Sequence, residues 1–161
     1  MRLPRSSLLL LMLLAILGST AASANAARRD AGRFILETLG KQQGDTWERV
    51  GQFMFWTYSF DRSGCLLSVQ READFGDLFQ QRIPLANATV VGAQNSEIVF
   101  DCRDGEACID YNSKSRRGAD ERSVARARLL VMDTRDINPL MNAFAELHQL
   151  CRDPYAPGRL R

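Results

Sequence analysis

Histidine is almost absent from this chain, and its scarcity limits the catalytic chemistry that the chain can carry. The 161 residues contain one histidine, His148, so Ser/His/Asp or Cys/His machinery would have to be built on it. No nucleophile-elbow sequence, phosphate-cradling loop or dinucleotide fingerprint is present. His148 falls on or near the apolar stripe of a helical segment, where a packing role is the usual one. We therefore expect no enzyme and no cofactor, with a small secreted hydrolase as the alternative.

The sequence also lacks the spacings that bind metals. No Cys-x-x-Cys occurs, and His148 has no partner at zinc-ligand spacing. The acidic stretch at 101–106 faintly resembles a calcium loop, but its glycine falls at the wrong offset. Asp61, Asp77 and Asp110 would suit a carboxylate pair for glycoside chemistry, yet nothing in the sequence brings them together. No metal site is predicted.

The first 26 residues have the order of a cleavable secretory signal. Arg2 and Arg5 make a charged start, residues 8–17 form a continuous apolar run, and two small-x-small sites follow at 22–24 and 24–26. The apolar run is too short to span a bilayer comfortably. A lipoprotein signal would require a cysteine after the apolar run, and none follows it. We therefore predict a chain exported to the periplasm or secreted, with residues 1–26 removed.

Removal of this segment cancels the net charge of the chain. The whole sequence has 21 Lys and Arg against 19 Asp and Glu, and Arg2 and Arg5 leave with the signal. A chain without a basic excess gives little support to a nucleic-acid partner. The remaining length of about 135 residues suits one domain with one core.

Four cysteines in an exported chain predict two disulfides, for which three connectivities are possible. Cys102 and Cys108 flank a five-residue turn, so a bond between them is the local choice. That choice leaves Cys65 with Cys151, which would tie a strand to the end of a helix. The alternation of side chains argues against the Cys102–Cys108 bond, because Cys102 shares a face with apolar residues and Cys108 shares one with Asp110. A bulge in the turn would bring the two cysteines to the same face.

The periodicity of apolar residues predicts helices at the two ends of the mature chain and strands between them. Residues 27–45 predict a short N-terminal helix and linker. We favour a helix that packs on the domain, and the alternative is an arm that binds a partner. A helix over 136–151 is expected to start at Asn138-Pro139 and to stop at Asp153-Pro154. Residues 154–161 are expected to be a disordered tail. Strands are expected at 52–61, 65–71, 78–85, 90–91, 97–102, 108–112 and 124–133, with a polar loop at 113–122.

These elements place the chain in the α+β class, mainly β. We expect residues 46–153 to form a single antiparallel barrel or sandwich of six or seven strands capped by a C-terminal α-helix. An up-and-down meander capped by such a helix resembles the pleckstrin-homology-like barrel, and the resemblance covers roughly residues 47–152 by element order. The resemblance implies a scaffold that mostly binds rather than catalyses. The tryptophan that this family commonly carries in its terminal helix is absent, since Trp47 and Trp56 lie elsewhere.

The most distinctive polar feature is a basic segment within residues 114–128. A flexible arginine-rich loop beside a strand with outward arginines can offer forked donors to phosphate or carboxylate oxygens. The alternative is a solvated loop and strand face. The residues of this possible anion-binding patch are Lys114, Arg116, Arg117, Arg126 and Arg128.

The function predicted from the sequence is an exported, non-enzymatic binding or interaction module for an unknown protein or anionic ligand. Besides the hydrolase, the second alternative is an envelope-surface protein that binds anionic lipid heads through the basic segment, as a peripheral membrane protein. The sequence indicates neither the partner nor the oligomeric state.

Overall fold

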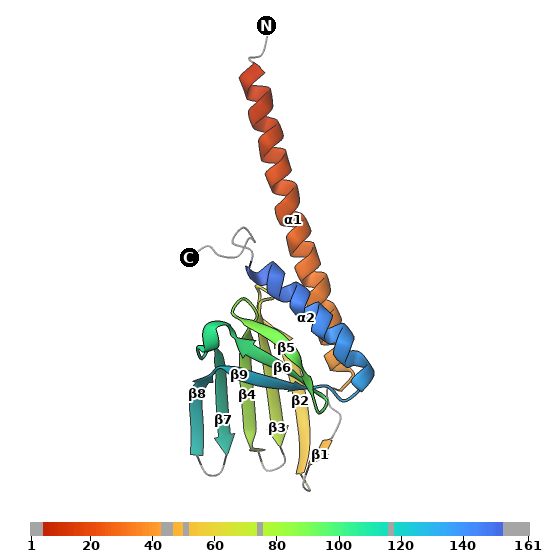
Figure 1. The fold of residues 1–161 in the computed structure, drawn as a ribbon, viewed down its shortest axis with the longest axis vertical. Coiled ribbons are helices and arrows are strands. Elements are labelled where there is room, and N and C mark those ends of the chain that lie inside the picture. The colour runs from red at the N-terminus through yellow and green to blue at the C-terminus, as the bar shows by residue number, and fades with distance from the viewer. Residues whose placement is uncertain (1–4, 43–46, 50–51, 74–75, 116–117, 153–161) are drawn as a thin grey trace.

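The computed structural model describes residues 5–42, 47–49, 52–73, 76–115 and 118–152, which form two antiparallel sheets accompanied by two helices (Figure 1). The six-stranded sheet has the order β1-β2-β3-β4-β7-β8, and the three-stranded sheet has the order β5-β6-β9. The strands of the larger sheet are β1 (Trp47–Arg49), β2 (Gln52–Phe60), β3 (Leu66–Ala73), β4 (Leu78–Pro84), β7 (Ile109–Ser115) and β8 (Gly118–Val124). Those of the smaller sheet are β5 (Ala88–Gln94), β6 (Glu97–Cys102) and β9 (Arg126–Leu130).

The mainly β fold with a C-terminal helix is confirmed, and of the two predicted architectures the sandwich fits. The sheets do not close into a barrel, so the pleckstrin-homology-like barrel does not describe this arrangement. The chain changes sheet three times, after β4, after β6 and after β8, and these crossings prevent a continuous up-and-down meander.

The predicted polar loop at 113–122 is wrong, because most of it belongs to the β7–β8 hairpin. Its tip, with Arg116 and Arg117, lies outside the described residues. Nearly every residue of β8 is exposed, so both of its faces are polar and the strand has no alternation by which to recognise it. Backbone pairing with β7 forms the strand instead. With β1, it raises the number of strands among the described residues above the expected six or seven.

The N-terminal helix α1 runs from Arg5 to Gly40, so the short helix expected after residue 26 is the second part of a longer one. Ile35 and Leu39 are fully buried, and α1 packs against α2 and β2 (Figure 1). The C-terminal part of α1 therefore belongs to the core and is not a free arm. No helix within the described part of the chain combines the length and apolar character needed to cross a membrane.

The C-terminal helix α2 (Ile137–Arg152) buries one side against α1 and the three-stranded sheet. Leu140, Phe144 and Leu147 are almost fully buried, and the Phe144 ring meets Phe100 edge-on, with the ring centroids 5.0 Å apart. The helix begins one residue before the predicted cap. A single 3-10 turn, η3 (Thr134–Asp136), leads into it, and Asp133 caps that turn. The predicted stop at Asp153-Pro154 and the tail at 154–161 lie outside the described residues.

Two disulfides join the four cysteines in the pairs that the sequence favoured. The long bridge joins Cys65 to Cys151, and the short bridge joins Cys102 to Cys108, with sequence separations of 86 and 6. The 3-10 turn η2 (Arg103–Gly105) lies between the cysteines of the short bridge. The objection from alternating faces does not apply, because β6 and β7 belong to different sheets and this turn is a crossing rather than a hairpin.

Candidate functional site

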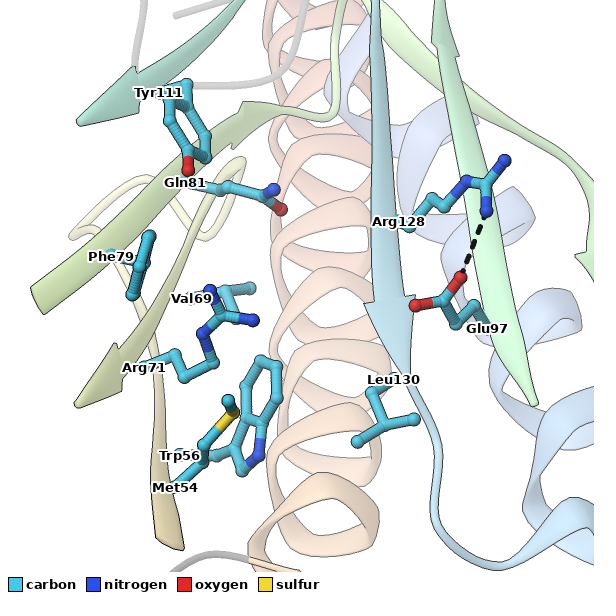
Figure 2. A pocket seen from close by; sticks show the side chains of 10 residues that line it. All are labelled: Met54, Trp56, Val69, Arg71, Phe79, Gln81, Glu97, Tyr111, Arg128 and Leu130. Carbon is cyan, nitrogen blue, oxygen red and sulfur yellow. Dashed lines mark hydrogen bonds and ion pairs between the residues drawn. The ribbon is translucent and has the colours of Figure 1, made fainter. Parts of the chain in front are cut away.

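A cavity of about 230 Å³ lies between the two sheets (Figure 2). The strands β2, β3, β4 and β7 of the larger sheet form one side, and β6 and β9 of the smaller sheet form the other. The residues that line it are Met54, Trp56, Val69, Arg71, Phe79, Gln81, Glu97, Tyr111, Arg128 and Leu130.

Strand register gathers the side chains on the larger sheet into neighbouring rows. Trp56 pairs with Arg71, and Arg71 pairs with Phe79, so these three residues stand side by side on β2, β3 and β4. Gln81 of β4 pairs with Val69 and, on its other side, with Tyr111, which forms the next row. Because side chains alternate across a strand, residues two positions apart face the same way. Both rows therefore point into the cavity (Figure 2).

The guanidinium group of Arg71 lies between two aromatic rings. Its Cζ atom is 4.0 Å from the centroid of the Phe79 ring and 5.6 Å from that of Trp56. Cations are attracted to the faces of such rings, and a guanidinium group can stack on them while its N–H donors point outward in its own plane. The two rings thus hold the charged end of Arg71 in place at the cavity.

The indole of Trp56 lines the same cavity. The residue is 9% exposed, and its Nε1 atom is buried without a hydrogen-bond partner among the described residues. A buried donor that makes no hydrogen bond costs about 1–3 kcal/mol relative to a satisfied one.

The opposite side of the cavity carries an ion pair. Arg128 Nη1 lies 3.3 Å from Glu97 Oε2, and both side chains remain partly exposed. Figure 2 shows this pair with Leu130 across the cavity from Arg71 and Trp56. Among the described residues that line the cavity, Glu97 is the only acid.

The structure disperses the predicted basic patch. Lys114 lies beside Ala119 near the tip of the β7–β8 hairpin, whereas Arg126 begins β9 beyond the other end of β8. Arg126 holds Asp101 with two contacts of 2.5 and 2.7 Å, and these hydrogen bonds lower the pKa of Asp101. Arg116 and Arg117 lie outside the described residues. Among the described members of the patch, Arg128 alone lines the cavity.

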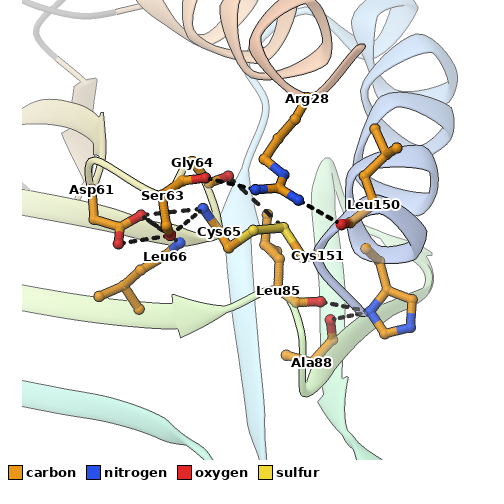
Figure 3. Close-up of a disulfide and its surroundings, with 11 residues drawn as sticks. Arg28, Asp61, Ser63, Gly64, Cys65, Leu66, Leu85, Ala88, Leu150 and Cys151 are labelled. Atoms are coloured by element: carbon orange, nitrogen blue, oxygen red, sulfur yellow. Dashed lines mark hydrogen bonds between the residues drawn. A yellow bond between two sulfur atoms is a disulfide. The ribbon is translucent and has the colours of Figure 1, made fainter. Parts of the chain in front are cut away.

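A second cavity, of about 370 Å³, separates α1 from the turn between β2 and β3. Two of its charged residues, Arg28 and Asp61, hold neighbouring segments of the fold together. Arg28 is buried and reaches the carbonyls of Ser63, at 3.4 Å, and Leu150, at 2.8 Å, beside the long bridge (Figure 3). Burial raises the pKa of Asp61, but hydrogen bonds from Ser63 and from backbone N–H groups of the turn outweigh this effect and lower it. We therefore assign this cavity a structural role.

His148 packs inside the fold, as expected. It is 7% exposed, and its Nδ1 atom lies 2.6 Å from the Leu85 carbonyl oxygen and 3.1 Å from that of Ala88. Because both partners are acceptors, Nδ1 carries the proton. In a Ser/His/Asp hydrolase this Nδ1 atom would donate to a carboxylate, but here it donates to backbone carbonyl groups.

The three aspartates named from the sequence do not meet as a group. Asp61 lies in the turn before β3 and Asp77 in the turn after it, at opposite ends of that strand, while Asp110 lies on β7. Within the described ranges, no cluster of three or more His, Cys, Asp or Glu side chains is placed to hold a metal ion.

Sequence reasoning missed the aromatic and polar lining of the inter-sheet cavity. One signal was present in β3, where Arg71 continues the alternation of Leu67 and Val69. A charged residue at an inward strand position is unusual, because burial of a charge is costly without a partner. Gln81 likewise interrupts the apolar alternation of β4.

Comparisons of this chain with protein-family models, with curated proteins and with solved structures found no match.

Proposed function

We propose that the mature chain is an exported, non-enzymatic binding module that holds a small molecule in the cavity between its sheets. The observation that carries the proposal is a cavity between two sheets in which the guanidinium group of Arg71 lies against the Phe79 ring among apolar side chains. Ligand sites are typically concave and mainly apolar, with a few polar groups that orient the ligand. The residues around this cavity supply both apolar surface and polar groups that can orient a ligand.

Export is supported by the position at which burial begins. Among the described side chains, which start at residue 23, the first buried one is Arg28, just beyond the predicted cleavage site after Ala26. Cleavage there would leave every buried contact of α1 in place. The two disulfides are compatible with an oxidising compartment.

The alternatives draw less support. A hydrolase built on His148 would need that side chain beside a substrate, and His148 lines neither cavity described above. Binding of lipid heads through the basic segment would need its cations to lie together and free of acids. Arg126 and Arg128 each pair with an acid, and Lys114 lies near the tip of the β7–β8 hairpin in the other sheet.

A fragment screen with a blocked variant tests the proposal. The full chain would be expressed with its own N-terminal segment, the mature form isolated, and its mass measured to locate the cleavage site. Native mass spectrometry would then screen neutral, anionic and cationic fragments of up to about twelve non-hydrogen atoms, a size suited to such a cavity. Gln81→Trp places a large ring in the cavity, and Thr57→Trp places one on the exposed face of the same sheet.

We expect fragments to bind the wild type and Thr57→Trp but not Gln81→Trp. Binding to no fragment, or equal binding to all three proteins, would contradict the proposed function. A mature mass that still includes residues 1–26 would contradict the export route.

A further inference from the structure

We infer that the ligand of the inter-sheet cavity is a small monocarboxylate whose body is a single aromatic ring or a short apolar chain. This inference rests on the proposed function and names the chemical class of the ligand. It follows from three properties of the cavity: the donors at one place in it, its charge, and its size.

The donors belong to the guanidinium group of Arg71. Trp56 and Arg71 are directly paired residues on β2 and β3, and the Arg71 Cζ atom lies 5.6 Å from the centroid of the Trp56 ring. The same atom lies 4.0 Å from the centroid of the Phe79 ring, and the five N–H donors of the group lie in one plane, where they can serve an acceptor in addition to other contacts. A carboxylate has two oxygens in one plane, which suits a guanidinium fork.

The charges around the cavity favour an anion of low charge. Glu97, the only acid among the described lining residues, is held by Arg128 at 3.3 Å on the far side. A cationic ligand would meet the guanidinium group of Arg71 and find the Glu97 carboxylate already engaged by Arg128. A dianionic phosphate would call for more cations than these, because clusters of arginine or lysine are the usual partners of phosphate.

The rest of the lining and the volume set the body of the ligand. Met54, Val69, Phe79 and Leu130 supply apolar surface around the donors. An apolar cavity of about 150 Å³ accommodates benzene, whereas this one measures about 230 Å³. The additional space is sufficient for a carboxylate on a ring, and too small for a large ligand such as a nucleotide or a lipid with long chains.

Calorimetric titration of the mature protein tests the assignment with matched ligands. Benzoate, phenylacetate and hexanoate carry the proposed group, benzamide and benzyl alcohol are neutral, benzylamine is cationic, and inorganic phosphate is an anion without an apolar body. We expect the carboxylates to bind at least tenfold more tightly than the neutral ligands, and neither benzylamine nor phosphate to bind measurably. Equal or tighter binding of a neutral or cationic ligand would overturn the inference.

Variants of the lining residues identify the side chain that binds the carboxylate of the ligand. Arg71→Met keeps a long side chain without donors and should weaken carboxylate binding at least tenfold. Trp56→Phe replaces the ring beside Arg71 with one that attracts cations less strongly, so it should weaken binding several-fold. Arg82→Met is the matched control, because Arg82 is exposed at the neighbouring position to Gln81 on β4 and does not line the cavity. Unchanged affinity in both cavity variants would overturn the assignment.

Two safeguards keep the outcomes distinct. Should Arg71→Met fail to fold, the ligand series on the wild type and the Trp56→Phe variant still decide the inference. Ligands that bind the wild type but not Gln81→Trp, without preferring carboxylates, would overturn the ligand class and leave the proposed function standing. Binding of nothing in the series or in the fragment screen would overturn both.

Discussion

Replacement of Gln42 by leucine should lower the free energy of unfolding by roughly 2 to 6 kcal/mol, because its amide joins the end of α1 to both sheets. The side chain is 5% exposed and follows the end of α1. Its Nε2 donates to the Leu130 carbonyl at 2.9 Å and to the Tyr58 hydroxyl, and its Oε1 accepts from the Met132 backbone N–H at 2.9 Å. Tyr58 lies on β2 of the larger sheet, and Leu130 ends β9 of the smaller one.

The expected size of the effect follows from the groups that leucine would leave without partners. A buried polar group that loses its hydrogen bond costs about 1–3 kcal/mol. The Leu130 carbonyl and the Tyr58 hydroxyl belong to buried residues, whereas Met132 is 36% exposed, so water can serve its N–H. Two such penalties add to about 2–6 kcal/mol, which is a large part of the 5–15 kcal/mol typical of a whole domain.

Urea unfolding followed by circular dichroism, with both disulfides intact, measures this effect. With a slope of about 2 kcal/mol per molar urea, in the middle of the usual range, the midpoint of Gln42→Leu should fall by about 1–3 M. The double variant Gln42→Leu/Tyr58→Phe should lose less than the sum of the two single variants, because it leaves no orphaned hydroxyl. A loss below about 1 kcal/mol, or strict additivity, would refute the reasoning.

Three further predictions concern stability. Replacing both cysteines of the long bridge with alanine should cost about 4 to 5 kcal/mol, and the same change in the short bridge about 2, because the closed loops differ in length; the reverse order in urea unfolding would contradict this. Burial raises the pKa of the Tyr58 hydroxyl to about 12, although the hydrogen bond with Gln42 acts in the opposite direction. The stability that the protonated hydroxyl contributes is therefore complete below its ordinary pKa of 10.0 and is lost as the pH rises toward 12. Tyr58→Phe should remove this alkaline loss from urea midpoints measured against pH, and an unchanged loss would implicate another group. His148→Leu should lower the free energy of unfolding by about 1–3 kcal/mol, since two carbonyls lose their donor, while carboxylate affinity measured by calorimetry stays unchanged; a variant as stable as the wild type would contradict this packing role.

The elements with one apolar face could be predicted from the sequence. The stripe that includes Leu140, Phe144 and Leu147 predicted α2 to within one residue of its start, and alternating residues predicted β2, β3, β4 and β6 closely. These elements bury one face against a core, so their periodicity appears directly in the order of the residues. β8 buries neither face, and it was therefore interpreted as a loop.

The candidate site depends on register, which alternation alone does not supply. The side on which Trp56, Arg71 and Phe79 point follows from the parity of their positions, but their alignment in one row depends on which residues pair across β2, β3 and β4. The second side of the cavity comes from a separate sheet, reached by crossings after β4 and β8. No local pattern in the sequence marks those crossings.

The disulfides are nested in the sequence, and this has a consequence for how the protein matures. Cys65 is followed by Cys102 and Cys108 before Cys151 appears. A chain that enters an oxidising compartment from its N-terminus presents its thiols in that order, so the first two to become available are not native partners. A bond formed in order of arrival must be exchanged by thiolate attack before the long bridge can close, and such exchange takes seconds to hours depending on the oxidant and isomerase present. We therefore expect cells without a disulfide isomerase to yield less native protein, while the protein that does mature is as stable as before.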